Sequence, residues 1–190
     1  MRLATFNLES FGGERTGEPE TLARLDVMRA ALLSLRADVL CLQEVNGQRP
    51  TGGGDRSLAD LALLLEGTPL SDHARISAGP GGAVGDRHNL VILSRFPVEA
   101  HRSLDHDLVP QSALRLPSQP DDPIPIAFDR PVLHATLRLP DGRPLEVFNA
   151  HLRAPLAAPV PGEKLGAHRW RSATGWAEGY YLAAMKQTAQ

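Results

Sequence analysis

Three polar side chains in this sequence lie at or just beyond the ends of short apolar segments. Asn7 follows residues 3–6, Glu44 ends the segment 39–43, and His151 comes shortly after residues 145–148. A carboxylate at the end of a buried strand cannot point unpaired into the core, because burial of a bare charge is costly. Glu44 must therefore face a pocket mouth, a charged partner or a metal ion. The pattern predicts one polar site at one edge of a β core.

The residue types at these three positions suit a particular chemistry. The oxygens of Asn7 and Glu44 are the ligands that a hard cation such as Mg²⁺ takes, with Mn²⁺ as an alternative. His151 at a strand end could act as a general acid, a general base or a phosphate contact. The residues alone leave two plainer interpretations open, an arginine partner for Glu44 and a structural hydrogen bond for His151.

Three further residues are candidates for contact with a substrate phosphate. Asn89 begins an apolar segment, where its amide could reach either a substrate or a loop backbone, and the sequence alone favours the loop. Arg130 precedes a predicted hairpin and suits a salt bridge as well as a phosphate. Asn149 lies two residues before His151, although a strand-end asparagine is most often a local hydrogen-bond partner.

Composition bounds the class of protein. The 190 residues suffice for one domain with a sizeable core, and a net charge of −2 provides no general attraction to nucleic acid or anionic membrane. The single cysteine, Cys41, lies within an apolar strand and is predicted to be a small core residue. No segment is apolar and long enough to span a bilayer, and no signal peptide is recognisable, so we expect a soluble, cytoplasmic protein.

Alternating strands and helices are predicted along the chain. A strand over residues 2–8, a helix from Pro19 to near Arg36 and a strand ending at Glu44 form a strand–helix–strand unit, which favours a parallel pairing of the two strands. We predict further strands and helices at the ranges 58–66 (helix), 74–77, 89–94, 98–103, 132–139 and 145–151 (strands), and 169–190 (helix). The proline-rich residues 105–129 are predicted to form a long loop that shapes a substrate mouth.

Four segments together resemble the endonuclease/exonuclease/phosphatase superfamily, which has the deoxyribonuclease I-like fold. They are residues 4–7 (ATFN), 38–45 (DVLCLQEV), 89–97 (NLVILSRFP) and 147–152 (VFNAHL). The second is the most specific, because it matches an apolar strand that ends in Leu-Gln-Glu. The order and spacing of the four agree with the family over nearly the whole chain.

The resemblance implies a Mg²⁺-dependent phosphoesterase of the nuclease or phosphatase type. The implied fold is an α/β (α+β), four-layered sandwich of two packed, mainly antiparallel β-sheets flanked by helices. Glu44 would be the metal-binding carboxylate, with Asn7 beside it, and His151 would contact the scissile phosphate or transfer a proton. The implied substrates are phosphate esters, either nucleic acid, phospholipid or inositol phosphate.

The sequence also departs from the family pattern. The family's Gly-Asp-x-Asn strand and its later Ser-Asp-His segment are both absent. We therefore expect a single domain over residues 1–190 that is truncated in its C-terminal half, lacks the C-terminal strands and has weak or no activity alone. An uncovered sheet would favour self-association. The alternative is a non-catalytic binding or assembly module that retains the fold.

Overall fold

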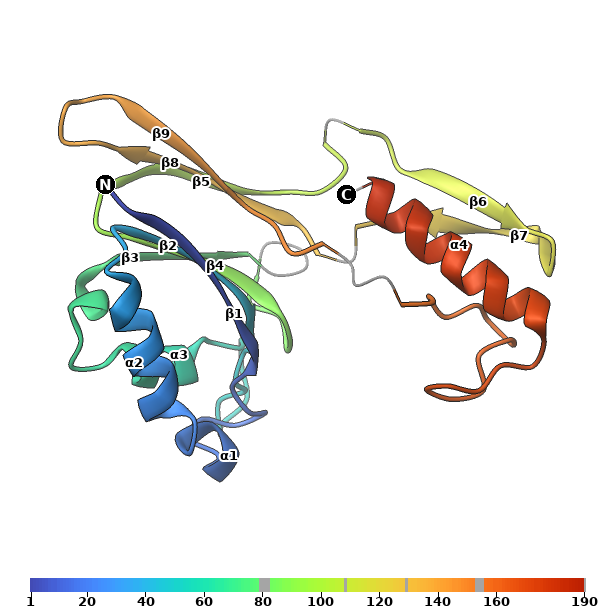
Figure 1. The fold of residues 1–190 in the computed structure, drawn as a ribbon, viewed down its shortest axis with the longest axis horizontal. Coiled ribbons are helices and arrows are strands. Elements are labelled where there is room, and N and C mark those ends of the chain that lie inside the picture. The colour runs from blue at the N-terminus through green and yellow to red at the C-terminus, as the bar shows by residue number, and fades with distance from the viewer. Residues whose placement is uncertain (79–82, 108, 129, 153–155, 190) are drawn as a thin grey trace. The chain divides into compact units, whose positions relative to one another are not determined.

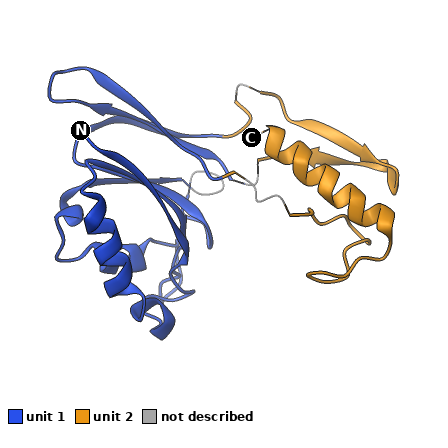
Figure 2. Ribbon diagram, in the orientation of Figure 1, with its two compact units in different colours: residues 1–104, 130–151 blue, residues 105–129, 152–190 orange. Residues whose placement is uncertain are grey.

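The computed structural model describes residues 1–78, 83–107, 109–128, 130–152 and 156–189. The chain forms two compact units, which Figure 2 shows in different colours. Unit 1 contains residues 1–104 and 130–151, and unit 2 contains residues 105–129 and 152–190. The chain crosses between the units three times, at residues 104/105, 129/130 and 151/152. The first two crossings coincide with the ends of the predicted loop 105–129, and the third follows the predicted strand 145–151.

Unit 1 contains two β-sheets and the N-terminal helices (Figure 1). The first sheet has the strand order β1-β2-β4-β3 and the second has the order β5-β8-β9. The strands are β1 (Leu3–Phe11), β2 (Val39–Val45), β3 (Ala74–Ala78), β4 (Asn89–Ser94), β5 (Val98–Leu104), β8 (Val132–Arg138) and β9 (Pro144–Asn149). Only β1 and β2 pair in parallel among the described strands, as the strand–helix–strand pattern predicted. The mixed α/β class with mainly antiparallel sheets is confirmed.

The first sheet is apolar on both faces because each face packs against a different layer. One face packs on the helices α2 (Leu25–Leu35) and α3 (Ala59–Leu65), in a cluster that includes Leu32, Leu40 and Leu61. The other face packs on the second sheet, in a cluster that includes Cys41, Ile92 and Leu133. This burial on both faces explains the unbroken apolar sequence of β2. Burial also raises the pKa of the Cys41 thiol to about 11, consistent with a core residue.

The predicted helix from Pro19 to Arg36 is interrupted, and this corrects the sequence prediction. A short helix α1 (Pro19–Leu22) precedes α2, and Arg24 lies between them. The Arg24 guanidinium donates hydrogen bonds to the backbone carbonyls of Leu8 (2.7 Å) and Glu9 (3.1 Å). This tertiary contact fixes the break, which no local propensity indicates. Arg36 ends α2 in a left-handed conformation, close to the predicted end.

Unit 2 replaces the predicted long loop with a β-hairpin, and the prediction for residues 105–129 was wrong in this respect. Strands β6 (Ser112–Leu116) and β7 (Gln119–Ile126) pair in antiparallel. In a two-stranded ribbon every strand is an edge, so prolines such as Pro123 and Pro125 need not break a ladder. The helix α4 (Ala173–Ala189) packs on this hairpin through Leu182, while Gln190 lies outside the described residues.

No helix in the described parts of the chain has the length and apolar character needed to cross a membrane.

Candidate active site

The sheet topology brings three strand ends to one edge of the first sheet. Strands β1 and β2 are parallel, and Asn7 lies opposite Gln43 in their register. Strand β4 runs antiparallel to β2, so its first residue, Asn89, lies opposite Val45. The C-terminal ends of β1 and β2 therefore meet the N-terminal end of β4. This arrangement places Asn7, Glu44 and the residue before β4, His88, in one neighbourhood.

Glu44 is the centre of this neighbourhood. Its Oε1 accepts a hydrogen bond from Asn7 Nδ2 (3.1 Å), and its Oε2 accepts one from the backbone N–H of Ser10 (3.0 Å). His151 Nε2 lies 3.5 Å from Oε1, and His88 Nε2 lies 3.9 Å from Oε2. The structure thus brings together Asn7, Glu44 and His151, as the strand-end pattern predicted. It adds Ser10 and His88 as further neighbours of the Glu44 carboxylate.

His88 is a residue of the site that the sequence reasoning missed. Its Nδ1 lies 2.7 Å from a guanidinium nitrogen of Arg130, and its Nε2 lies 2.8 Å from Ser10 Oγ. A guanidinium has only N–H donors, so Nδ1 must accept, and the proton of the neutral imidazole resides on Nε2. Through His88 the site also includes Arg130. No sequence signal pointed to His88, because it joins the site only through the antiparallel pairing of β4 with β2.

The backbone around the site is unusual. Glu9, Ser10, Glu44 and His88 have φ angles of 53°, 52°, 59° and 57°, a region that side chains other than glycine rarely occupy. The pairing of β1 with β2 shifts register between Asn7 and Phe11. Bulges and left-handed residues concentrate at functional sites, where they aim side chains in directions that a regular strand does not allow. Here they turn Glu44 toward Asn7 and Ser10.

Asn46 holds these unusual segments together. Its Nδ2 donates to the backbone carbonyls of Ser10 (3.2 Å) and Gly12 (2.8 Å), and its Oδ1 accepts from the backbone N–H of His88 (3.2 Å). The side chain is buried, so these bonds are shielded from water. One amide thus fixes the end of β1 and the start of β4 relative to β2. Gly12 has a φ of 106°, and a Cβ there would lie 2.5 Å from Gln48 Nε2.

The electrostatics of the site favour an ionised Glu44 beside two neutral imidazoles. Burial alone would raise the pKa of Glu44, but the hydrogen bonds from Asn7 and Ser10 lower it below its ordinary value. Burial, followed by the Arg130 guanidinium, lowers the pKa of His151. The same two causes lower the pKa of His88. A neutral imidazole can accept a proton, and the imidazolium that then forms can return it, which suits a site for acid–base chemistry.

Asn149, predicted as a phosphate contact, has a different environment. Its Nδ2 donates to the backbone carbonyls of Leu42 (2.9 Å) and Val91 (3.0 Å), and its Oδ1 accepts from Gln43 Nε2 (2.7 Å). Only 2% of its surface is exposed. The structure therefore gives Asn149 a structural role, in which it joins β9 of the second sheet to β2 and β4 of the first.

Asn89 is likewise buried and structural, whereas Arg130 reaches the site. Asn89 Nδ2 donates to the carbonyls of Val45 (2.8 Å) and Gly85 (3.0 Å), and its Oδ1 accepts from the N–H of Gly85 (2.7 Å). These bonds realise the loop-backbone alternative that the sequence favoured. Arg130 remains the candidate phosphate contact, because its guanidinium lies against His88 at the site.

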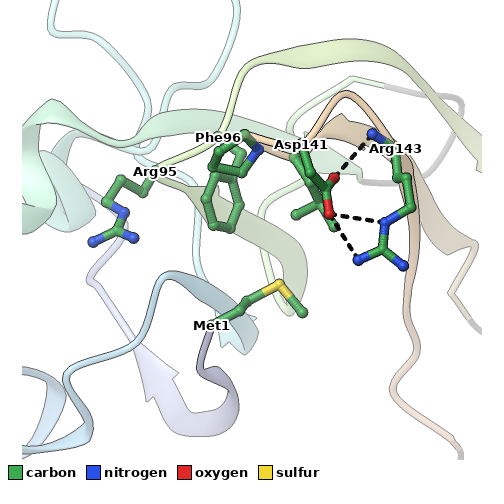
Figure 3. A pocket seen from close by; sticks show the side chains of 7 residues that line it. Met1, Arg95, Phe96, Asp141 and Arg143 are labelled. Atoms are coloured by element: carbon green, nitrogen blue, oxygen red, sulfur yellow. Dashed lines mark hydrogen bonds and ion pairs between the residues drawn. The ribbon is translucent and has the colours of Figure 1, made fainter.

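A separate pocket of about 340 Å³ lies at the other end of β4 (Figure 3). Phe96 forms part of its apolar lining, and Arg95 and Arg143 stand at its rim. Both arginines already have partners: Arg95 pairs with Asp38 (3.0 Å) and Arg143 with Asp141 (2.7 Å). The charges of these two arginines are thus compensated within the protein.

The donor set at Glu44 fits a weakly held divalent cation. The Glu44 carboxylate supplies oxygens that Mg²⁺ accepts, and Mg²⁺ keeps most of its waters when one or two carboxylates bind it. Asn7 supports this carboxylate through Nδ2, while its Oδ1 accepts from the backbone N–H of Glu9 (2.8 Å). The Glu44 side chain is 21% exposed, so an ion can reach it from solvent. Among the described residues, no cluster of three or more acidic, histidine or cysteine side chains completes a cage. The fit is therefore to a cation that is shared with water and substrate.

Comparisons with solved structures found several similar chains, of which the first below supports the same fold. An endonuclease/exonuclease/phosphatase family protein from Leptotrichia buccalis C-1013-b is 15% identical, with a TM-score of 0.51 over 82% of this chain and 56% of that chain. TDP2 from Caenorhabditis elegans is 17% identical, with a TM-score of 0.45 over 78% and 34%. A mannosyl-6-phosphatase of Bacteroides thetaiotaomicron VPI-5482 is 17% identical, with a TM-score of 0.45 over 77% and 49%.

This chain thus spans about half, or less, of the length of these solved structures. None of the curated proteins matches the sequence. The model of the Endonuclease/Exonuclease/phosphatase family matches residues 4–183, which cover most of both compact units and every residue of the site described above. The chain belongs to the Endonuclease/Exonuclease/phosphatase family.

Proposed function

We propose that this protein hydrolyses phosphate esters at the site around Glu44. The observation that carries the proposal is the convergence of Asn7, Glu44, His88 and His151, from four separate segments, on one partly exposed carboxylate. Membership of the family supports phosphate-ester chemistry as the class of reaction. The alternative, a non-catalytic module, is favoured only by the absence of the Gly-Asp-x-Asn and Ser-Asp-His segments.

Glu44 would hold a divalent cation, Mg²⁺ or Mn²⁺, with Asn7 as its neighbour. Such an ion, when bound, supplies charge stabilisation for the phosphoryl oxygens and a more acidic bound water. Asn7 orients the carboxylate through its Nδ2 hydrogen bond, and the Ser10 N–H fixes the second oxygen. These two contacts outweigh the effect of burial and lower the pKa of Glu44, which favours the ionised carboxylate.

The cationic and imidazole groups of the site would bind the substrate phosphate. Arg130 provides a guanidinium, whose planar fork suits the oxygens of a phosphate. The lowered pKa of His151 favours its neutral form, which would take a proton from the attacking water, and the imidazolium so formed would give that proton to the leaving oxygen. His88 would hold the Arg130 guanidinium in place through Nδ1. The scissile group would thus lie between Glu44 and Arg130.

The test is hydrolysis of bis(p-nitrophenyl) phosphate with and without Mg²⁺ or Mn²⁺. We expect slow, metal-dependent turnover, because the chain lacks two segments of the family pattern. His151→Ala should lower the rate by about 100-fold or more, the usual contribution of a positioned acid or base. Glu44→Gln should lower it at least as much, because it removes the carboxylate that would hold the cation. Glu20→Gln, an exposed acid on α1, is the matched control and should keep the wild-type rate. Equal rates in Glu20→Gln and Glu44→Gln would contradict the proposal.

A further inference from the structure

Unit 2 contains an aromatic pocket that the proposed chemistry does not use. Its volume is about 210 Å³, and its lining includes Trp170, Trp176, Tyr180, Lys164 and His168. The pocket lies wholly within unit 2. Trp176 and Tyr180 are 49% and 42% exposed, which is unusual for large aromatic side chains without a ligand.

Side chains of α4 form one wall of this pocket. Trp176 and Tyr180 are four residues apart on α4, so they share one face, and their rings meet edge to face at 5.0 Å. Trp170 lies against the helix backbone at Gly179, where a Cβ would come within 2.6 Å of the Trp170 ring. Glycine at this position is therefore what lets the third aromatic ring join the other two.

A short loop places positive charge on the same pocket. Lys164 and Trp170 face each other across an antiparallel bridge, and the backbone of Arg171 donates to the Glu163 carbonyl (2.8 Å). This arrangement holds the Lys164 ammonium 5.5 Å from the centre of the Trp170 ring. Residues 164–171 (KLGAHRWR) contain three positive charges and a histidine but no acid. The aromatic platform thus lies beside a cationic loop.

The aromatic rings and the cationic loop together favour one class of ligand over the others that aromatic rings bind. A cationic ligand is disfavoured, because Lys164 already occupies the face of Trp170. A neutral sugar is disfavoured, because the lining residues include no carboxylate or carboxamide to accept from its hydroxyls. An anion that carries a flat ring satisfies both features, with the ring stacked on tryptophan and the phosphate near Lys164 and His168. Unpaired nucleotides have this chemistry.

We infer that the aromatic pocket of unit 2, formed by Trp170, Trp176, Tyr180 and Lys164, binds an unpaired nucleotide of a single-stranded nucleic acid. A base within a duplex has both faces covered by its neighbours, so only an unpaired base can stack on these rings. The inference goes beyond the proposed hydrolysis and does not depend on it. It concerns binding in unit 2, whereas hydrolysis is assigned to Glu44 in unit 1.

Tryptophan fluorescence tests the inference directly, because the chain has only two tryptophans and both line this pocket. We expect oligothymidylate of ~10 nucleotides to quench the fluorescence in a saturable manner that weakens with added salt. Ribose 5-phosphate, which lacks a base, should not quench, and the same sequence in a duplex should not either. Glu44→Gln should bind like the wild type, so that failure of the hydrolysis proposal leaves this result intact.

Variants separate a role in binding from a role in folding. Trp176→Ala should weaken binding of a labelled oligothymidylate about 10-fold, whereas Trp176→Phe should largely restore it. Lys164→Gln should weaken binding and reduce its salt dependence. Tyr181→Ala, an exposed aromatic on the same helix, is the matched control and should bind normally. Absence of quenching, equal binding by Trp176→Ala, or equal quenching by duplex or ribose 5-phosphate would overturn the inference.

Discussion

At the scale of single residues, the molecule separates two kinds of strand-end side chain. Asn7, Glu44 and His151 converge at a partly exposed site, whereas Asn149 and Asn89 are buried and bonded to backbone groups. The sequence favoured a local hydrogen-bonding role for Asn89 and Asn149 but kept both as candidate phosphate contacts, because all five are polar residues beside apolar strands. The direction in which each side chain points depends on register and on bulges. Those are properties of strand pairing and not of a single strand.

The structural role of Asn149 has a measurable consequence. Asn149→Ala would remove the side-chain donor to the buried carbonyls of Leu42 and Val91, whereas the Gln43 amide would keep its bonds to Thr5 and Cys41. Each such loss costs about 1–3 kcal/mol, so the free energy of unfolding should fall by at least ~2 kcal/mol. Urea denaturation measures the change. Asn7→Ala, at an exposed position, should cost well under half as much, and equal losses in the two variants would refute this assignment.

At the scale of elements, Asp38, which directly precedes β2, links the start of β1 to the end of β4. Its carboxylate accepts from the backbone N–H of Arg2 before β1 (2.7 Å) and pairs with Arg95 after β4 (3.0 Å). The hydrogen bond from Arg2, against the opposing effect of burial and with help from Arg95, lowers the pKa of Asp38. Its stabilising contribution is therefore present above the unfolded-state pKa of about 3.9 and is lost as the pH falls through the folded-state pKa.

Urea unfolding at several pH values tests this link between elements. The wild type should be more stable than Asp38→Asn at pH values near neutrality, and the difference should shrink below about pH 4. Because Arg95 is 63% exposed, its ion pair alone contributes little, and Arg95→Gln should show a smaller effect than Asp38→Asn. A stability difference that stays constant with pH would show that Asp38 does not act through its charge.

Most of the strands of unit 1 could be predicted from the sequence, whereas the hairpin of unit 2 could not. The ends of β2, β4, β8 and β9 lie within a few residues of the predicted ones, because apolar segments flanked by turn signals define them. The hairpin of β6 and β7 was missed, because its prolines argue against strands unless both strands are known to be edges. His88 was missed for a related reason: it belongs to the site only through the antiparallel pairing of β4 with β2.

At the scale of the whole molecule, the second sheet of unit 1 ends at β9, an edge strand in the described sheet. Phe148 on β9 is 60% exposed and stacks on His134 at 4.4 Å. An exposed edge beside an apolar side chain favours pairing between chains. We therefore expect the 190-residue chain to self-associate, and Phe148→Ser to reduce association without loss of the fold. A monodisperse monomer in light scattering at high concentration would argue against this expectation.

The central claim is that the strand ends around Glu44 form one site for a divalent cation, and binding of Mn²⁺ tests it most directly. Electron paramagnetic resonance of free Mn²⁺ measures the affinity without any need for turnover. We predict one Mn²⁺ site per chain, for which Mg²⁺ competes. The affinity for Mn²⁺ should fall in Glu44→Gln by more than the roughly 10-fold that loss of a supporting residue costs, and it should be unchanged in Glu20→Gln. Equal Mn²⁺ binding by the wild type and Glu44→Gln would contradict the claim.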